Sequence, residues 1–351
     1  MKKSLFLLIA LLLGLPLAAV KVWADEERNN VTVPDSEALS DRIEALEKNS
    51  PVKIGVLLQV QYLHNSISSL TGNYDQFIGK RAEIKFSGDL KPEKISFTLV
   101  YDPLQTPTKQ LKDYYGKISY IPYADFQFGQ GKYPQGLEGR TPSGDLDFVN
   151  RALVSTAFGD KRDLFFQVSG TGLPEGGVKN DYALALVQGA GQNTPENNAD
   201  KDLAGRSGWQ WDDLWVGLSG YLGWEPTGVR DNYGLEGRWS YKGLKLQGEY
   251  LQGQLEPGNG GNPIPAVNKL PSNPRGYYLS ANYRLEDWRL GARWESYNSD
   301  STVGSVYDVN NDVLTLGVDW FQSKDRFRVY VDFEEHYKQY EAVLTQVEVC
   351  L

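Results

Sequence analysis

The sequence predicts an all-β protein, a transmembrane antiparallel β-barrel of about 16 strands. The 351-residue chain has 36 Gly, 21 Tyr, 13 Phe and 9 Trp against one Met and one Cys. Its mean hydropathy is nevertheless only -0.45. Beyond Pro51, apolar and polar residues alternate with a period of two, and the connections between these runs alternate between tight and long. Strands that show one face to lipid and the other to water produce this combination.

The first 24 residues are typical of a secretory signal peptide. Met1-Lys2-Lys3 gives a positive start, Leu5 to Val20 is an apolar core, and Val22-Trp23-Ala24 offers a cleavage site after Ala24. An uncleaved anchor is the alternative, but the apolar run is short for a membrane span. After it, no run of about eighteen apolar residues occurs, so a membrane protein of this sequence must be a barrel.

Residues 25–51 are predicted to form a periplasmic segment with one short helix from Ser36 to Asn49. The helix carries apolar residues at a/d spacing, which are Leu39, Ile43 and Leu46. Because two heptads are too short to be stable alone, the helix either joins three chains in a homotrimer or is a simple spacer. The barrel is then predicted over residues 52–351.

Strand-length runs of alternating residues fill the barrel region. One near its start has Ile54, Val56, Leu58, Val60 and Tyr62 alternating with Gly55, Gln59 and Gln61, and one near its end has Phe327, Val329, Val331 and Phe333 alternating with Arg328, Asp332 and Glu334. Tilted strands of about ten residues span a bilayer. Six tryptophans are predicted to form girdles at the membrane interfaces, and these are Trp209, Trp211, Trp215, Trp224, Trp288 and Trp294.

The connections predict which side of the membrane each strand end faces. Tight links occur at 88–92, 121–122, 242–243, 286–287 and 323–324, and long polar ones at 65–76, 132–162, 192–200, 256–275 and 298–311. Short periplasmic turns and long external loops are typical of outer-membrane barrels, with both termini in the periplasm. The longest non-alternating stretch, from Lys132 to Arg162, is predicted to be an external loop that folds inward and narrows the lumen.

Composition narrows the possible functions. The formal net charge of -9 becomes -12 without the three signal-peptide lysines, which excludes nucleic acid as a partner. The lone Cys350 excludes an internal disulfide framework and a cysteine-built metal site, and no cofactor is predicted. A calcium site in the Asn- and Asp-rich run from Asn193 to Asp202 is a lesser alternative to ordinary loop chemistry. An enzyme such as a barrel phospholipase is also less favoured, because His64 and His336 have no serine motif beside them.

Several motifs in fixed order carry a resemblance to a known family. They are Gly129-Gln130-Gly131-Lys132-Tyr133-Pro134-Gln135-Gly136-Leu137-Glu138, then Phe148-Val149-Asn150-Arg151-Ala152-Leu153-Val154, then Arg162-Asp163-Leu164. This order resembles the phosphate-selective porin O/P family, and the similarity extends over nearly all of Val52 to Leu351. The resemblance implies a trimeric, sixteen-stranded outer-membrane porin whose third external loop, here Lys132 to Arg162, folds inward and whose lumenal arginines and lysines guide anions.

Strand parity and the third external loop supply the candidate anion path. Its residues are Arg81, Lys85, Lys132, Arg140, Arg151, Arg206, Arg238, Lys245, Arg284, Arg293 and Arg328, and Arg289 shares the inward parity. Guanidinium and ammonium groups replace an anion's hydration shell, and arginine binds phosphate with two parallel hydrogen bonds. The alternative for each cation is an ion pair with an inward carboxylate, such as Glu83, Glu236, Glu249, Glu295 or Asp332.

The sequence therefore predicts passive diffusion of small hydrophilic solutes, with anions such as phosphate as the preferred class. A non-selective or cation-preferring porin is the alternative within transport, because the interleaved carboxylates also fit a general porin. A barrel with a purely structural role is a further alternative. Outer-membrane lipid is the expected surrounding, and the protein is not expected to be an enzyme.

Overall fold

The computed structural model describes residues 52–66, 74–90, 94–172, 177–196, 198–225, 228–254, 273–301, 310–322, 326–337 and 339–351. The signal peptide and the N-terminal helix predicted above lie outside these residues. In the described ranges, no helix is long and apolar enough to cross a membrane.

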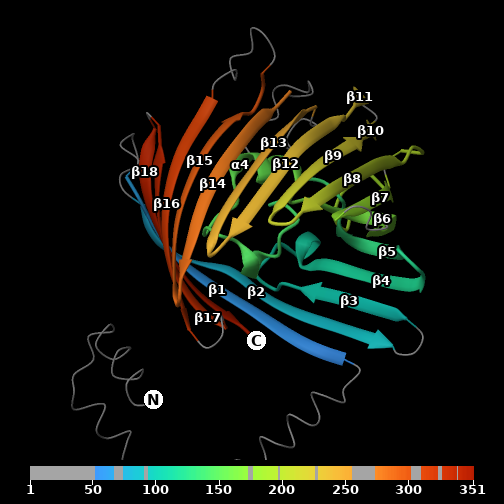
Figure 1. The fold of residues 1–351 in the computed structure, drawn as a ribbon, viewed down its shortest axis with the longest axis horizontal. Helices are drawn as coiled ribbons and strands as arrows, with labels where there is room; N and C mark the ends of the chain where they lie inside the picture. The colour runs from blue at the N-terminus through green and yellow to red at the C-terminus, as the bar shows by residue number, and fades with distance from the viewer. Residues whose placement is uncertain are drawn as a thin grey trace, which may run out of the picture. The chain divides into compact units, whose positions relative to one another are not determined.

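Sixteen antiparallel strands close into one barrel in chain order (Figure 1). They are β1 (Val52–Asn65), β2 (Tyr74–Leu90), β3 (Ile95–Tyr101), β4 (Leu111–Ile121), β5 (Ala124–Lys132), β6 (Arg162–Thr171), β7 (Val178–Val187), β8 (Asp202–Trp211), β9 (Leu214–Leu222), β12 (Asn232–Tyr241), β13 (Leu244–Gly253), β14 (Arg275–Leu285), β15 (Trp288–Asn298), β16 (Asn310–Gln322), β17 (Phe327–His336) and β18 (Tyr340–Cys350). A separate hairpin, β10 (Trp224–Glu225) and β11 (Gly228–Val229), lies between β9 and β12. β1 pairs with β18, so the barrel has no free edge, as a bilayer requires. The predicted barrel is confirmed.

The strand register places apolar and aromatic side chains on the outer face of the barrel and charged side chains on the inner face. One row that runs from strand to strand holds Leu235, Tyr250 and Tyr277, all exposed on the outside. The next row holds Glu236, Glu249, Tyr278 and Glu295, all buried inside the barrel. A one-residue alternation therefore turns aromatic and aliphatic side chains to lipid and carboxylates to the lumen.

Aromatic side chains gather on the outer surface beside the short turns. Trp239 stacks on Tyr241 with 5.9 Å between ring centroids, and Trp288, Trp320 and Phe327 form a second group with centroids 6.4 and 6.1 Å apart. Such clusters are typical of membrane interfaces. The prediction that Trp215 joins a girdle was wrong, because Trp215 is buried and its indole N–H donates to lumenal Asp181 at 2.8 Å.

The turns on one side of the barrel are tight, as predicted. The two-residue turns at 122–123, 212–213, 242–243 and 286–287 each contain one non-glycine residue at positive φ, namely Tyr123, Asp212, Lys242 and Glu286. Most connections on the opposite side are longer, and the longest among the described residues joins β5 to β6. The connection from β17 to β18 is short although it lies on this side, because β17 ends at His336 and β18 starts at Tyr340.

Two β-bulges change which residues face the lumen. Gln59 lies opposite Arg81 and Val60 opposite Gly79, so Lys80 is an extra residue in β2. In the same way Val100 lies opposite Asp113 and Tyr101 opposite Leu111, which leaves Lys112 as the extra residue in β4. A bulge lets two consecutive side chains point to one face. Lys80 and Lys112 therefore enter the lumen beside Arg81 and Asp113, which strict alternation does not predict.

Gly129 in β5 offers a test of the barrel wall. Its φ is +130°, and an added Cβ would lie 2.2 Å from the backbone oxygen of Tyr114. We expect Gly129→Ala to lower barrel stability by about 1–3 kcal/mol, seen as a lower melting temperature by circular dichroism in detergent. The control is Gly237→Ala, whose Cβ meets nothing within 4 Å. Equal melting temperatures for both variants would contradict this account of β5.

Candidate functional site

The chain between β5 and β6, residues 133–161, is here called loop L3. It contains a 3-10 helix, η2 (Ser143–Asp145), and a short α-helix, α4 (Leu153–Phe158). In Figure 1 it lies inside the ring of strands, in green. Phe148, Val149, Ala152, Val154 and Phe158 are each at most 2% exposed. The predicted inward fold of the third external loop is confirmed.

Wall carboxylates bind the backbone of L3. Glu249 on β13 accepts a hydrogen bond from the Leu137 N–H at 2.9 Å and another from the Ser155 hydroxyl at 2.9 Å. Asp332 on β17 accepts from the Val149 N–H at 2.7 Å, and Glu295 on β15 accepts from the Leu153 N–H at 2.5 Å. An irregular loop has few backbone partners of its own, so these charged acceptors satisfy its buried N–H groups.

Arginines from the same wall bind the carbonyl groups of L3. Arg289 donates to the backbone oxygen of Asp147 at 2.6 Å and pairs with its carboxylate at 2.8 Å. Arg328 donates to the Leu146 carbonyl at 2.7 Å, and Arg293 to the Asn150 carbonyl at 2.9 Å. Lys245 also pairs with Asp147. These four candidate cations hold the loop, so their charges are matched by L3 and by neighbouring carboxylates.

One edge of L3, which contains Arg151 and Asp160 and is here called the free edge, faces β2, β4 and β6 across a network of ion pairs. Lys132 at the end of β5 lies 2.7 Å from Asp160, Arg151 lies 3.5 Å from the same carboxylate, and Arg162 lies 2.8 Å from Asp113. Burial alone raises the pKa of Asp160, but Lys132, Arg151 and Arg162 together hold this pKa below its usual range. Asp160 therefore remains a carboxylate at the centre of three cations.

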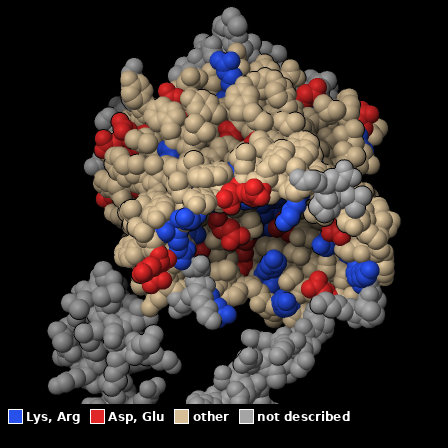
Figure 2. All heavy atoms as spheres, viewed as in Figure 1, with Lys and Arg blue, Asp and Glu red and all other residues tan. Residues whose placement is uncertain are grey.

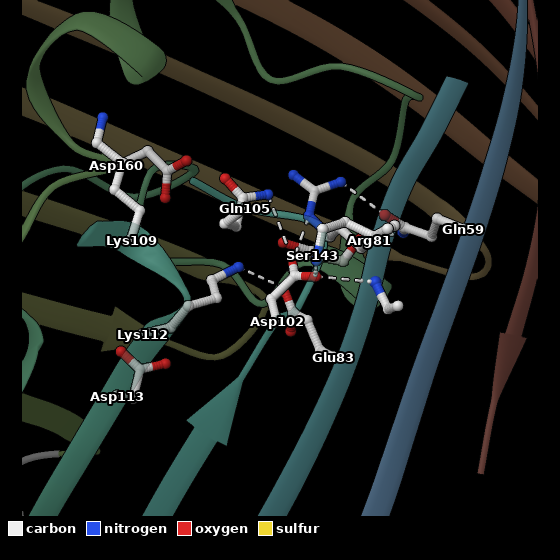
Figure 3. A network of polar contacts seen from close by, with 12 residues as sticks. Gln59, Arg81, Glu83, Asp102, Gln105, Lys109, Lys112, Asp113, Ser143 and Asp160 are labelled. Atoms are coloured by element: carbon white, nitrogen blue, oxygen red, sulfur yellow. Dashed lines mark hydrogen bonds and ion pairs between the residues drawn. The ribbon is translucent and has the colours of Figure 1, made fainter. Parts of the chain in front are cut away.

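Figure 3 shows the neighbouring part of this network on the wall. Arg81 points to Gln59, with 2.6 Å between the guanidinium and the amide oxygen, and its nearest carboxylate is Glu83 at 3.7 Å. Lys112, the bulge residue of β4, pairs with Glu83. The buried Asp102 accepts from the Ala82 and Leu104 N–H groups and so fixes the end of β3. The wall opposite L3 thus presents alternating charges in fixed positions.

Arg206 on β8 lies in a second cluster. Its guanidinium is 2.9 Å from Asp181 and 3.0 Å from Glu236, and it lies 4.4 Å above the ring of Trp215. An added Cβ at Gly208 or Gly217 would come within 2.4 or 2.2 Å of that ring. The two glycines therefore let the indole lie flat on the wall beneath Arg206.

The remaining candidate cations differ in how their charge is matched. Arg284 donates to the Glu286 carbonyl at 2.8 Å and lies 3.7 Å above the Phe321 ring. Within the part of the chain that the structure describes, Lys85, Arg140 and Arg238 form no ion pair. Burial, together with the nearby Arg206, lowers the pKa of Arg140 to about 10, so this loop residue stays charged at neutral pH.

In the space-filling view, acidic and basic side chains gather around a hollow, and the surface above it is mostly uncharged (Figure 2).

A cationic pocket of about 300 Å³ lies beside the base of L3. Lys109, Lys161, Arg162 and Arg230 line it together with Asp160 and Asp163. Asp163 accepts from the Gly189 and Gly191 N–H groups at 3.0 and 2.9 Å, so its charge is already matched by the backbone. The pocket lies between the start of β6, which follows L3, and the connection from β7 to β8.

The Asn- and Asp-rich run after β7 forms hydrogen bonds rather than an ion cage. The Asn193 amide donates to the Thr108 and Leu111 carbonyls at 2.8 Å and accepts from Gln130 at 3.0 Å. Among the described residues, no three His, Cys, Asp or Glu side chains are arranged to hold a metal.

Residues 53–211 match the family model described as phosphate-selective porin O and P. The matched residues run from β1 to the end of β8, and this part of the barrel is similar to that porin family. No curated protein matches the chain. The whole barrel resembles solved porins, and 86% of the chain is covered in each comparison. They are an anion-selective porin from Comamonas acidovorans (TM-score 0.59, 10% identity, 99% of that chain), OmpF of Salmonella typhi in complex with daunomycin (TM-score 0.62, 10% identity, 97% of that chain) and the outer membrane channel DcaP of Acinetobacter baumannii (TM-score 0.59, 11% identity, 97% of that chain).

At this level of identity the solved structures show a shared fold alone. With the closed sixteen-stranded barrel and the family match, they make this protein an outer-membrane porin that allows passive diffusion of small solutes.

The sequence missed several lumenal residues. Lys80 and Lys112 enter the lumen only through bulges, and no residue pattern marks these. Lys109, Lys161 and Arg230 lie in connections, for which strand parity says nothing. The Arg162-Asp163-Leu164 motif did point to Arg162, but as part of a family resemblance rather than as a lumenal group.

The Glu249 contact tests how L3 is held. We expect Glu249→Ala to leave the Leu137 N–H and the Ser155 hydroxyl without their acceptor, at a cost of about 2–4 kcal/mol to the docking of the loop. Single-channel records in planar bilayers should then show a larger and noisier conductance. Glu335→Ala, on the outer face of β17, should leave conductance unchanged. A quiet wild-type conductance in Glu249→Ala would exclude this role.

Proposed function

We propose that this porin conducts small anions, phosphate among them, in preference to cations. The observation that carries the proposal is the unequal use of lumenal charges. Glu249, Glu295 and Asp332 accept hydrogen bonds from the backbone of L3 and are buried beneath it. Arg140, Arg238 and Lys85 have no ion pair among the described residues.

This asymmetry matters because permeating ions respond to the charges that face the water. A carboxylate buried behind a loop is matched by N–H donors and contributes little to the field in the pore. An unpaired guanidinium exchanges part of an anion's hydration shell for its own donors. Arg140 is such a cation on L3 itself: Arg206 repels it and Glu236 and Asp181 attract it, but it forms no ion pair among the described residues.

The pocket beside the base of L3 supports anion entry from the loop side. Burial lowers the pKa of Lys161, and the nearby Lys109 and Arg230 lower it further while Asp160 opposes them. Mutual repulsion of this kind means that several cations share a small volume, which attracts an anion.

A weakly selective or cation-preferring porin is the second candidate. Glu83, Asp113 and Asp160 face cations across the free edge of L3, an arrangement that produces a transverse field without selecting phosphate. The formal net charge of -9 also favours this candidate, because an acidic chain attracts cations to the pore entrances. The selectivity measurement below separates the two.

The proposal includes the parts of the chain outside the described residues. Residues 1–24 act as a signal peptide, residues 25–51 form a periplasmic segment, and three copies associate as a homotrimer in outer-membrane lipid. The protein acts as a channel and not as an enzyme. His64 contacts Asp75 at 2.5 Å, and His336 contacts Glu334 at 3.2 Å and stacks on Tyr340. Among the described residues, neither imidazole is hydrogen-bonded to a serine hydroxyl.

Reversal potentials in a potassium chloride gradient test the anion preference. We expect the wild type to favour chloride, and Arg140→Gln and Arg238→Gln each to lower the chloride-to-potassium permeability ratio by about twofold, since each removes one unpaired cation. Millimolar phosphate should reduce the wild-type chloride current. The matched control is Lys242→Gln, which changes a cation in a tight turn beside Tyr241.

A wild-type reversal potential near zero, with no effect of phosphate, would favour the weakly selective porin. A potential of the opposite sign would favour cation preference and contradict the proposal.

A further inference from the structure

A second pocket lies between L3 and the barrel wall, and Arg151 and Asp160 at the free edge of the loop are part of its lining. It has a volume of about 390 Å³. Its charged lining comes from β2, β15, β17 and L3, and its apolar lining is Val149, Leu153, Val313 and Tyr340. β17 ends at His336 and β18 begins at Tyr340, so the pocket opens toward the longer connections, the external side in such barrels.

Most charges in this pocket have a partner of opposite sign close by. Arg293 lies 3.1 Å from Glu295, Arg151 lies 3.5 Å from Asp160, and Arg81 lies 3.7 Å from Glu83. Two charges remain. Lys80 donates to the neutral Asn150 amide at 3.0 Å and forms no ion pair among the described residues. Glu334 accepts from the Asn150 amide at 3.5 Å and contacts the His336 imidazole at 3.2 Å; Arg293 and Lys80 attract it without forming an ion pair.

Asn150 connects these two charges. Its amide oxygen accepts from the Lys80 ammonium, and its amide nitrogen donates to the Glu334 carboxylate. The pocket therefore presents one cation and one anion on either side of a small dipole, beside an apolar lining. A ligand that carries both charges a few bonds apart matches this arrangement, whereas a simple anion or cation leaves one of the two unmatched.

The bulge in β2 makes the arrangement possible. Because Lys80 is the extra residue of the bulge, it reaches the lumen next to Arg81 instead of pointing to lipid. Bulges commonly re-aim a side chain at functional sites. Lys80 is half-buried, and even partial burial of an ammonium without an ion pair costs solvation free energy.

We propose that this pocket binds zwitterionic solutes of the α-amino acid class with a small apolar side chain. The solute carboxylate lies toward Lys80, the solute ammonium toward Glu334, and its side chain against Val149, Leu153 and Val313. The pocket forms a subsite on the external side of L3. This proposal rests on the proposed channel function only because solutes reach the pocket through the lumen.

Equilibrium binding to the purified, refolded protein in detergent tests the site without requiring conduction. Saturation-transfer NMR with L-valine should give a signal that isovalerate, which lacks the ammonium, and isobutylamine, which lacks the carboxylate, each give at least about tenfold more weakly. Lys80→Gln and Glu334→Gln should each weaken valine binding by about tenfold. Lys80→Arg should retain most of it.

Matched controls are Lys242→Gln and Glu335→Gln, which remove the same charges outside the lumen. Circular dichroism and gel mobility establish that each variant is folded. If Lys80→Gln fails to fold, Glu334→Gln and the valine analogues still decide the matter.

Equal signals from valine and isovalerate, with no effect of Glu334→Gln, would overturn the proposal and make the pocket a plain anion subsite. No valine signal in a barrel that conducts chloride would reject the pocket and leave the porin function intact. Valine binding in a barrel that does not conduct would support the pocket and count against the proposed channel function.

Discussion

The structure depends on the binding of the L3 backbone by charged groups of the barrel wall. Carboxylates of β13, β15 and β17 accept from loop N–H groups, and arginines of β15 and β17 donate to loop carbonyls. An irregular segment inside a barrel has no strand or helix ladder for most of its polar groups, so the wall must supply partners. Lumenal charges that at first suggest a continuous ion path are therefore in large part the means by which the loop is held.

Because some lumenal charges bind L3 and others do not, a permeating solute is exposed to only part of the lumenal charge. The charges that clamp L3 lie on the side from β13 to β18 and match one another. The lumen that remains is bordered by the free edge of L3 and by the wall from β2 to β8, where Arg81, Lys132, Arg162 and Arg206 lie among fewer loop contacts. In the proposed function, selectivity therefore depends on this second side and on the cations without an ion pair among the described residues, and not on the total charge of the chain.

Much of the fold could be read from the sequence because a barrel strand has a strict period of two. The same rule placed Arg206, Arg289, Arg293 and Arg328 inside the lumen, and the absence of alternation marked L3. The alternation predicts which face of the barrel a side chain lies on, but not which residue it contacts. It could not separate Arg328, which binds the Leu146 carbonyl, from Arg238, which has no ion pair among the described residues. It also fails at bulges, and so both Lys80 and Lys112 were missed.

Tethering L3 to the wall tests the central claim most directly. Val149 and Leu344 belong to one buried cluster, so a Val149→Cys, Leu344→Cys pair in a Cys350→Ser background joins the loop to β18. Single-channel conductance is measured before and after reduction of the disulfide. The account predicts a disulfide that forms readily and leaves conductance unchanged, because the loop already lies there. A pair that fails to oxidise in the folded barrel, or a conductance that changes on reduction, would contradict it.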